Sequence, residues 1–504
     1  MPKVNEKSQW SFRKGLILRD RRTLAWLCLV LWGIGAMIGS AKAQPGKEVL
    51  LDIPGLARIL EESCLRKAQT GLRVVSLRTG QVLFDRRGED LFVPASNVKL
   101  VTTAAALSRL GARYTFQTAV YTDGRWQGPR LQGNLYLEGR GDPGLVSERL
   151  WLIVQDLKGR GLEGVEGDLV ADESYFDDQR WGEGWPEPTR PQASYARVGA
   201  LSLNFNTVTV HVEPAREAGQ PARVVVEPPT DYIQLVNHIQ TRPAGSQEDQ
   251  AGLVVDRIVG PEGDRIVATG TVPLGAQRMA FYRNISDPAA YTAQTFKDFL
   301  AREGVVIQGK VVKGKVPPTA SLLATYPSRP LFAIVQDLNK WSNNFIAEQI
   351  LKTLGAELKG RPGTAAKGLE VVSEFLAGLG IPPQRYRLAD GSGLSRLDRL
   401  SPAQIVRVLE QMYRNFPLQA EYLSSLAMMG EDGSLRGRLA GTPAQGRVRA
   451  KTGTLDGVRS LSGYLQTPGG EPLAFSFLVN FGPECSAGEV TRLQDRVCLL
   501  LGGG

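Results

Sequence analysis

The chain has 504 residues, of which 42% are hydrophobic and 22% charged, so it is long and apolar enough for two or three globular domains. Its formal net charge is +9, spread along the sequence apart from one dense basic cluster near the N-terminus. Diffuse positive charge suits acidic polymers in general, including an anionic cell envelope, but the sequence has no basic stripe with stacking aromatic residues, so we predict no nucleic-acid partner.

The first 43 residues predict an export signal. Basic residues precede an apolar run over 23–40, and Ala41-Lys42-Ala43 forms an A-x-A cleavage site. We therefore expect a mature N-terminus at Gln44 and a periplasmic or other extracytoplasmic location. The alternative is an uncleaved anchor, because the apolar run is close to the roughly 20 residues that span a bilayer. Only in that case do we expect contact with a membrane.

The next elements lead into a buried helix. Helical periodicity covers 53–67, and two strands then flank a turn at 78–81. The segment 93–111 predicts a loop and a helix, which Ser96 can cap and Gly111 can end. Most of this helix is apolar or small, as in a helix at the centre of a domain, yet its first turn carries Ser96 and Lys99.

The middle of the chain has a different character. Many short β-like runs with Gly, Pro and Asp between them predict an inserted, mostly β region over 115–316, with a nested subdomain around 206–285. A helical stretch over 330–355 follows. Three strands at 446–453, 458–467 and 472–482 and a closing helix at 488–501 complete an α+β sandwich built from both ends of the chain.

Several kinds of site are excluded by composition. The only histidines, His211 and His238, lie in the inserted region, which argues against a Ser-His-Asp triad and against a zinc site. The GxxxxGK phosphate loop is absent from the sequence. We therefore predict no metal and no cofactor, and lysine as the base if a serine is activated.

Ser96 and Lys99 have the spacing that such a pair needs. Residues i and i+3 share one face of a helix, and the helix N-terminus offers free N–H groups to a developing oxyanion. The lysine must be neutral to act as a base, so its pKa must fall by about 3 units from its usual value near 10.4, through burial or a second cation nearby. The spacing alone is a weak signal, because Ser11 and Lys14 share it.

Two later triplets strengthen the interpretation. Ser342-Asn343-Asn344 stands at the start of a helical segment, and Lys451-Thr452-Gly453 stands on a predicted strand. Together with Ser96-x-x-Lys99 they give the order S-x-x-K, S-x-N, K-T-G, the known signature of penicillin-binding proteins and class A β-lactamases.

With these motifs, the sequence resembles D-alanyl-D-alanine carboxypeptidases/endopeptidases of the penicillin-binding protein 4 type, the low-molecular-mass class C penicillin-binding proteins. That branch also has a large insertion between its first two motifs. Further resembling segments are "LEGRGDPGL" (137–145), "DESYFDD" with "GEGW" (172–185), "VGALSLNFNTV" (198–208), "ADGSGLSRLDRLSP" (389–402) and "MMGEDGSLRGRL" (428–439).

The resemblance implies a transpeptidase-like fold, an antiparallel sheet with helices on both faces. It implies a catalytic domain from 44–114 and 317–504, serine-type acyl transfer on peptidoglycan stem peptides, and β-lactams as covalent inhibitors. The residue roles it implies are the nucleophile (Ser96), its base (Lys99), a proton relay (Ser342), an amide contact (Asn344), a cation that suppresses the charge of the base (Lys451), carboxylate and strand contacts (Thr452, Gly453, Thr454), and an oxyanion hole from the N–H groups of Ser96 and Thr454.

The substrate side-chain pocket departs from the family pattern. Pro188 stands where an acidic residue is usual, and Asp456 stands where a serine is common, while Ser392 and Arg396 match the remaining side of that pocket. The preferred third residue of the stem peptide therefore stays open, as does the balance between carboxypeptidase and endopeptidase action.

Two alternatives share this fold: a β-lactamase, and a non-catalytic cell-wall binding protein. The long insertion and Ser342, in place of a Tyr in the second motif, argue against a β-lactamase. The intact Ser, Lys and Asn motif residues argue against a mere binding protein.

Cys64, Cys485 and Cys498 allow at most one internal disulfide, or three inert thiols. The first and last helices of the resembled fold lie side by side, which implies a Cys64–Cys498 bridge, with Cys485–Cys498 as the alternative.

Overall fold

The computed structural model describes residues 53–61, 63–186, 190–245 and 252–503. The predicted export signal over 1–43 and the pocket position Pro188 lie outside these residues. Within the described ranges, no helix has the length and the apolar character that crossing a membrane requires.

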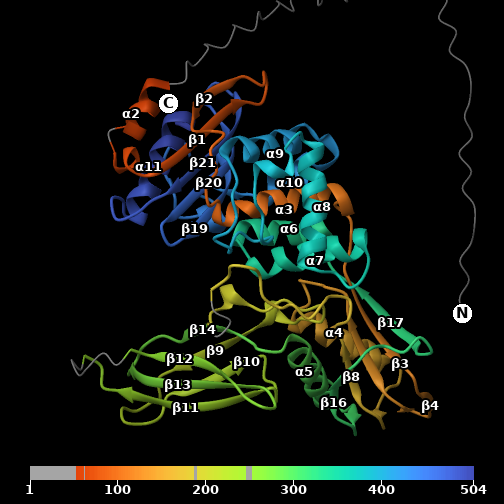
Figure 1. The fold of residues 1–504 in the computed structure, drawn as a ribbon. Coiled ribbons are helices and arrows are strands. Elements are labelled where there is room, and N and C mark those ends of the chain that lie inside the picture. Colours follow the sequence, from red (N-terminus) through yellow and green to blue (C-terminus); the bar gives the residue numbers. More distant parts are fainter. Residues whose placement is uncertain (1–52, 62, 187–189, 246–251, 504) are drawn as a thin grey trace, which may run out of the picture. The chain divides into compact units, whose positions relative to one another are not determined.

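The catalytic part is organised around a six-stranded sheet (Figure 1). Every neighbouring pair is antiparallel. The strand order is β18 (Ala427–Met428), β19 (Val448–Leu455), β20 (Val458–Gln466), β21 (Pro472–Asn480), β1 (Gln69–Ser76) and β2 (Val82–Arg86). The two ends of the chain therefore share one sheet, since β1 pairs with β21.

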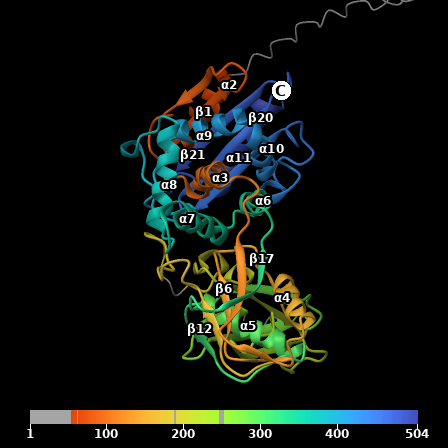
Figure 2. The same cartoon turned by 90° about the vertical axis from the view of Figure 1, so that its right-hand side faces the viewer.

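Helices cover both faces of this sheet (Figure 2). On one face, α2 (Ile53–Glu61) and α11 (Ala487–Gly502) enclose one apolar core. A second core lies on the other face, with the helices α3 (Val98–Leu110), α6 (Leu331–Trp341), α7 (Asn344–Lys359), α8 (Ala365–Gly378), α9 (Pro402–Arg414) and α10 (Phe416–Ser425). The predicted α+β fold is confirmed.

The helix α3 is the central element of the second core. Every residue from Val98 to Leu107 is buried, and Gly111 ends the helix with a φ of 87°. That left-handed conformation is one that glycine adopts without steric cost. The amphipathic pattern expected of a surface helix is missing here because neighbouring helices and the sheet surround α3, which is why its sequence is apolar or small nearly all round.

The chain between α3 and α6 forms the insertion. A five-stranded sheet has the order β16 (Val311–Lys313), β8 (Leu169–Asp172), β6 (Leu135–Gly139), β3 (Gln117–Thr122) and β17 (Ser321–Pro327), and a four-stranded sheet has the order β15 (Val306–Ile307), β7 (Gly164–Val165), β5 (Arg130–Gln132) and β4 (Arg125–Gln127). Helices α4 (Ser147–Gly159) and α5 (Pro288–Arg302) pack against each other. The predicted boundary at 316 is too early, because β17 pairs with β3.

Two three-stranded sheets lie between residues 207 and 284. One has the order β10 (Arg223–Glu227), β9 (Thr207–Glu213) and β14 (Met279–Asn284), and the other has the order β11 (Ile233–Arg242), β13 (Asp264–Pro273) and β12 (Val254–Val259). His211 lies on β9, beside Glu227, and His238 lies on β11. Both histidines thus belong to sheets other than the one that carries the K-T-G strand.

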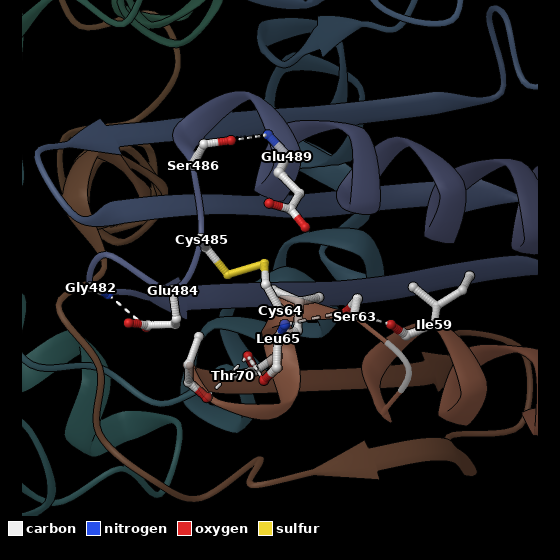
Figure 3. Close-up of a disulfide and its surroundings, with 11 residues drawn as sticks. Ile59, Ser63, Cys64, Leu65, Thr70, Gly482, Glu484, Cys485, Ser486 and Glu489 are labelled. Carbon is white, nitrogen blue, oxygen red and sulfur yellow. Dashed lines mark hydrogen bonds between the residues drawn. A yellow bond between two sulfur atoms is a disulfide. The ribbon is translucent and has the colours of Figure 1, made fainter.

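The predicted disulfide partner is wrong. Cys64 bridges Cys485, with 5.5 Å between their Cα atoms, and Cys498 is a buried free thiol (Figure 3). The first and last helices do lie side by side as expected, because α2 and α11 are in contact. Cys64, however, lies in a short 3-10 turn after α2, next to the loop that leads into α11. Cys498 lies roughly 16 Å further along that helix, at the usual rise of 1.5 Å per residue.

Candidate active site

Ser96 lies in a tight turn directly before α3. The 3-10 turn Ala95–Asn97 leads into the helix, and Asn97, not Ser96, takes the N-cap position. The prediction that Ser96 caps the helix is therefore wrong. Ala95 has a φ of 47°, a conformation that costs a non-glycine residue about 1–3 kcal/mol.

Close packing around the turn maintains this strained conformation. A Cβ at Gly393 would lie 1.8 Å from the carbonyl oxygen of Ala95. A Cβ at Gly453 would lie 1.9 Å from Ser460 Oγ and 2.9 Å from the carbonyl oxygen of Pro94. Ser460 Oγ donates to that same carbonyl at 2.7 Å. The glycine of the K-T-G motif is thus required by the close approach of the serine turn to β19.

Lys99 is fully buried and contacts three oxygen atoms. Its Nζ lies 3.0 Å from Ser96 Oγ, 2.7 Å from Asn344 Oδ1 and 2.6 Å from the carbonyl oxygen of Ser392. The amide and the carbonyl oxygens can only accept hydrogen bonds, whereas a hydroxyl can also donate. A neutral amine has two N–H donors and one lone pair, so it satisfies all three partners when Ser96 donates its hydroxyl proton to the lone pair.

The surroundings favour that neutral form. Burial lowers the pKa of Lys99 to about 8, against the opposing influence of the carboxyl groups of Asp390, Glu348 and Asp398. The sequence predicts Lys451 as the cation that suppresses the charge of Lys99. In the structure burial is the main cause, and the charge repulsion is instead seen at Lys451, whose pKa lies well below its usual value through burial and then through Lys99.

Ser342 lies at a break between two helices. The predicted helical stretch over 330–355 divides here, because Ser342 adopts a left-handed conformation with a φ of 57° at the end of α6. Asn343 then caps α7 by accepting from the N–H of Ile346. Lys451 Nζ donates to Ser342 Oγ at 2.8 Å and to the carbonyl oxygen of Thr452 at 2.8 Å. The site therefore holds two serine–lysine pairs.

Asn344 connects the base to the insertion. Its Oδ1 accepts from Lys99, and its Nδ2 donates to the carbonyl oxygen of Ser194 at 2.9 Å. Ser194 lies in a 3-10 turn, Ala193–Tyr195, of the insertion. One of the two amide protons of Asn344 is thus used by the insertion, which leaves the other for the amide contact that the resemblance implies.

The outer edge of β19 is open beside the serine turn. β18 pairs only with Arg449 and Ala450, and Asn97 Nδ2 donates to the carbonyl oxygen of Lys451 at 2.9 Å. A cavity of about 270 Å³ lies along the exposed side of this strand; its lining includes Thr452, Thr454, Ser434, Arg438 and Arg459. Thr452 Oγ1 donates to Ser434 Oγ at 3.0 Å. Ser434, in the segment 428–439, thus lines this cavity beside Thr452, although no sequence motif marks it.

The two predicted pocket residues have different environments. Arg396 is exposed, donates to the carbonyl oxygen of Asp456 at 2.6 Å, and shares with Asp456 the lining of a cavity of about 490 Å³. Ser392 is fully buried, and its hydroxyl donates to Asp390 at 3.3 Å. Its predicted place in a substrate pocket is therefore wrong: Ser392 contributes its carbonyl to Lys99, not its side chain to a surface.

Comparison with known proteins gives the family of the chain. The model of the D-Ala-D-Ala carboxypeptidase 3 (S13) family matches residues 54–495. The chain belongs to the S13 family. A related S13 sequence, the D-alanyl-D-alanine carboxypeptidase of an Actinomadura species, is 38% identical over 475 residues, covering 91% of this chain and 86% of the relative.

Solved structures extend the S13 comparison to the whole fold. Penicillin binding protein 4 (dacB) from Haemophilus influenzae superposes with a TM-score of 0.77 at 26% identity, covering 90% of this chain and all of that one. The same H. influenzae protein complexed with a novel β-lactam superposes with a TM-score of 0.72 at 25% identity, covering 89% of this chain and all of the other. The predicted family and its transpeptidase-like fold are confirmed.

The S13 chain also contains buried carboxyl groups that the sequence analysis did not assign. Glu348, Asp390 and Asp398 all lie near Lys99 and are nearly inaccessible to solvent. The segment "ADGSGLSRLD" contains both aspartates, but an Asp in a polar loop is normally expected to be exposed to solvent, so the sequence does not predict their burial. Among the described residues, no group of His, Cys, Asp and Glu side chains is arranged to hold a metal ion.

Proposed function

We propose that the protein is a serine D-alanyl-D-alanine carboxypeptidase that acts on peptidoglycan stem peptides through an acyl-enzyme and is acylated by β-lactams. The observation that carries this proposal is the contact set of Lys99. Two of its three partners can only accept hydrogen bonds, so in the neutral amine both N–H groups are used by them and the lone pair is left for the third partner, the Ser96 hydroxyl.

Acylation follows from this geometry. Ser96 Oγ attacks the carbonyl carbon of the penultimate D-alanine while its proton passes to Lys99 Nζ. The negative charge that develops on the carbonyl oxygen would be held by the N–H groups of Ser96 and Thr454, at the N-terminal side of α3 and on the open edge of β19. Loss of one such donor typically lowers the rate by about 100- to 1000-fold.

The second pair completes the transfer. When the C–N bond breaks, the Ser342 hydroxyl gives its proton to the departing amine of the terminal D-alanine and takes up the proton that Lys99 received from Ser96, so that Lys99 is neutral again; Lys451 holds Ser342 in place through their 2.8 Å hydrogen bond. Water then attacks the ester carbonyl, its proton returns through Lys99, and Ser96 is regenerated with the shortened stem peptide released. Thr452 and Thr454 face a cavity that can take the terminal carboxylate.

The same acyl transfer would cut D-alanyl cross-links, because the leaving amine then belongs to a neighbouring stem peptide. We include this endopeptidase reaction in the proposal, together with an extracytoplasmic location. The location is supported by the export pattern over 1–43 and by the Cys64–Cys485 disulfide, a bond typical of oxidising compartments.

Labelling with a fluorescent penicillin tests the reaction class. We expect stable covalent label on the wild type and none on Ser96→Ala, with both proteins equally folded by thermal denaturation. Rapid loss of label would indicate a β-lactamase, and absence of label on the wild type would indicate a non-catalytic wall-binding protein. Product analysis on defined muropeptides, monomeric and cross-linked, then separates carboxypeptidase from endopeptidase action.

A further inference from the structure

The loop of residues 389–398, here called the Asp390 loop, determines the position of the base. Its Ser392 carbonyl accepts from Lys99 Nζ at 2.6 Å, and its Gly391 carbonyl accepts from Thr102 Oγ1 at 2.7 Å. Both donors lie on one face of α3. The loop also touches the serine turn, since Gly393 packs against Ala95. Any displacement of this loop therefore moves an acceptor of the base.

Asp390 organises this loop from within. Its side chain is 1% exposed and accepts five hydrogen bonds. Within the loop the donors are the N–H of Ser392 (3.1 Å), the hydroxyl of Ser392 (3.3 Å), the N–H of Gly393 (2.6 Å) and the N–H of Ser395 (2.8 Å). A carboxyl group surrounded by donors on both oxygens is arranged as an anion.

The other two carboxyl groups of the cluster are not arranged in this way. Glu348 accepts from the N–H of Gly391 and interacts with the Ser392 hydroxyl, and Asp398 accepts from the N–H of Ala389, while Asp398 Oδ2 meets no donor. Burial and the nearby Asp390 raise the pKa of Glu348 to about 8 and that of Asp398 well above its usual value. A proton on Asp398 can be donated to Asp390. Among the three carboxyl groups, the hydrogen bonds therefore favour Asp390 as the site of the negative charge.

The fifth donor to Asp390 comes from the insertion. The indole N–H of Trp185 donates to Asp390 Oδ2 at 2.8 Å, and the Trp185 ring packs against Leu394. Two glycines permit this approach. A Cβ at Gly182 would lie 2.3 Å from the indole nitrogen, and a Cβ at Gly184, whose φ is 73°, would lie 2.7 Å from Ser395 Oγ. The segment "GEGW" is thus shaped to reach a buried carboxylate.

We propose that Asp390 is a positioning residue for Lys99, held in its charged form by the donors of the Asp390 loop and by Trp185 of the insertion. The proposal rests on the function proposed above. During acylation Lys99 becomes an ammonium in a buried site, and Asp390 compensates that charge while its loop keeps the Ser392 carbonyl in contact. The charged or titratable groups that face Lys99 are Glu348 from α7, Asp390 and Asp398 from the loop, and Lys451 from β19.

The test compares two substitutions of the same chemistry. The second-order rate of acylation by fluorescent penicillin is measured from pH 6 to pH 9.5 for the wild type, Asp390→Asn and Asp398→Asn. Asp390→Asn removes the charge, so we expect a plateau rate lower by about tenfold or more and a midpoint shifted to lower pH by about one unit. Asp398→Asn replaces a neutral carboxyl group by a neutral amide, so we expect the rate and midpoint of the wild type.

Trp185→Phe removes the indole donor and keeps the ring. We expect slower acylation with an unshifted pH midpoint. If Asp390→Asn does not fold, the Trp185→Phe measurement tests the proposal in its place. A wild-type rate in folded Trp185→Phe or folded Asp390→Asn would overturn the proposal, as would an equal shift in Asp398→Asn. A wild-type protein that takes no label at any pH would instead refute the proposed function, so the two failures are distinguishable.

Discussion

Lys99 owes its chemical state to a few neighbours contributed by distant parts of the chain. Ser96 lies one turn before it, Asn344 begins another helix, and Ser392 lies in a loop. Burial removes the hydration that would stabilise an ammonium, and it outweighs the nearby carboxyl groups. The same desolvation acts on Lys451, where Lys99 adds repulsion. Two lysines are thus available for proton transfer near neutral pH.

The pKa of Lys99 predicts a pH profile for acylation. Only the neutral amine accepts the Ser96 proton, and the pKa is about 8, so the fraction of active enzyme falls as the pH falls below 8. We expect the acylation rate to fall about tenfold per pH unit below pH 8 and to level off above it. Stopped-flow measurement with a fluorescent penicillin checks this, and a rate that is constant from pH 6 to pH 9 would contradict it.

The sequence predicts the reactive residues more clearly than the residues that position them. Ser96, Lys99, Ser342 and Lys451 are predicted from three short motifs and meet in the structure as two hydrogen-bonded pairs. Burial and a second cation, Lys451, were both expected to lower the pKa of Lys99, and burial is the main cause; its extent depends on what packs around the helix, which no local pattern encodes. Ser392 shows the same limit, since its carbonyl, which every residue has, makes the functional contact.

At the scale of elements, the sheet strands were predictable and the breaks between helices were not. β19, β20 and β21 match the predicted strands closely, because short apolar runs between turn residues mark them, and β20 and β21 are buried along nearly their whole length. The start of a helix at the triplet 342–344 was predicted, but the break from the preceding helix, at Ser342, was not. Its left-handed backbone is unusual for serine, and the helical pattern continues on both sides of it. The insertion helices α4 and α5 were also missed, among many short β-like runs.

The disulfide between the turn after α2 and the loop before α11 should stabilise this face of the sheet. We expect Cys485→Ser to lower the free energy of unfolding by about 2–5 kcal/mol. Dithiothreitol should lower the melting temperature of the wild type and of the control Cys498→Ala, and leave that of Cys485→Ser unchanged. After unfolding without reductant, alkylation should reach Cys498 while Cys64 and Cys485 stay protected; an alkylated Cys64 would contradict the pairing.

At the scale of the whole molecule, the insertion contacts the catalytic part through ion pairs and hydrogen bonds to side chains of α7. Lys352, whose side chain is 4% exposed, pairs with Asp177 at 2.5 Å and also donates to the carbonyl of Gln179. Gln349 Nε2 donates to the carbonyl oxygen of Gly199 at 2.9 Å. Burial lowers the pKa of Lys352, so this cation depends on its partner.

Removing Asp177, the partner of Lys352, should lower the stability of the protein. We expect Asp177→Asn to lower the free energy of unfolding by about 3 kcal/mol, because it leaves a buried ammonium without its counter-charge. The neighbouring exposed carboxylate provides a control: Asp178→Asn should change the stability by less than about 0.5 kcal/mol. Urea denaturation measures both. Recovery of most of the loss in the double variant Lys352→Met with Asp177→Asn would identify the unpaired charge as the cause.

The pairing of β1 with β21 and the hydrogen bond from Asn97 to Lys451 also determine when the enzyme can first act. The two residues are 354 positions apart. At a synthesis speed of about 5–20 residues per second, roughly 20 to 70 s separate their appearance on the ribosome. During that interval the nascent chain has its serine but lacks the strand that completes the site. The reactive centre is therefore assembled only when almost the entire polypeptide has been made.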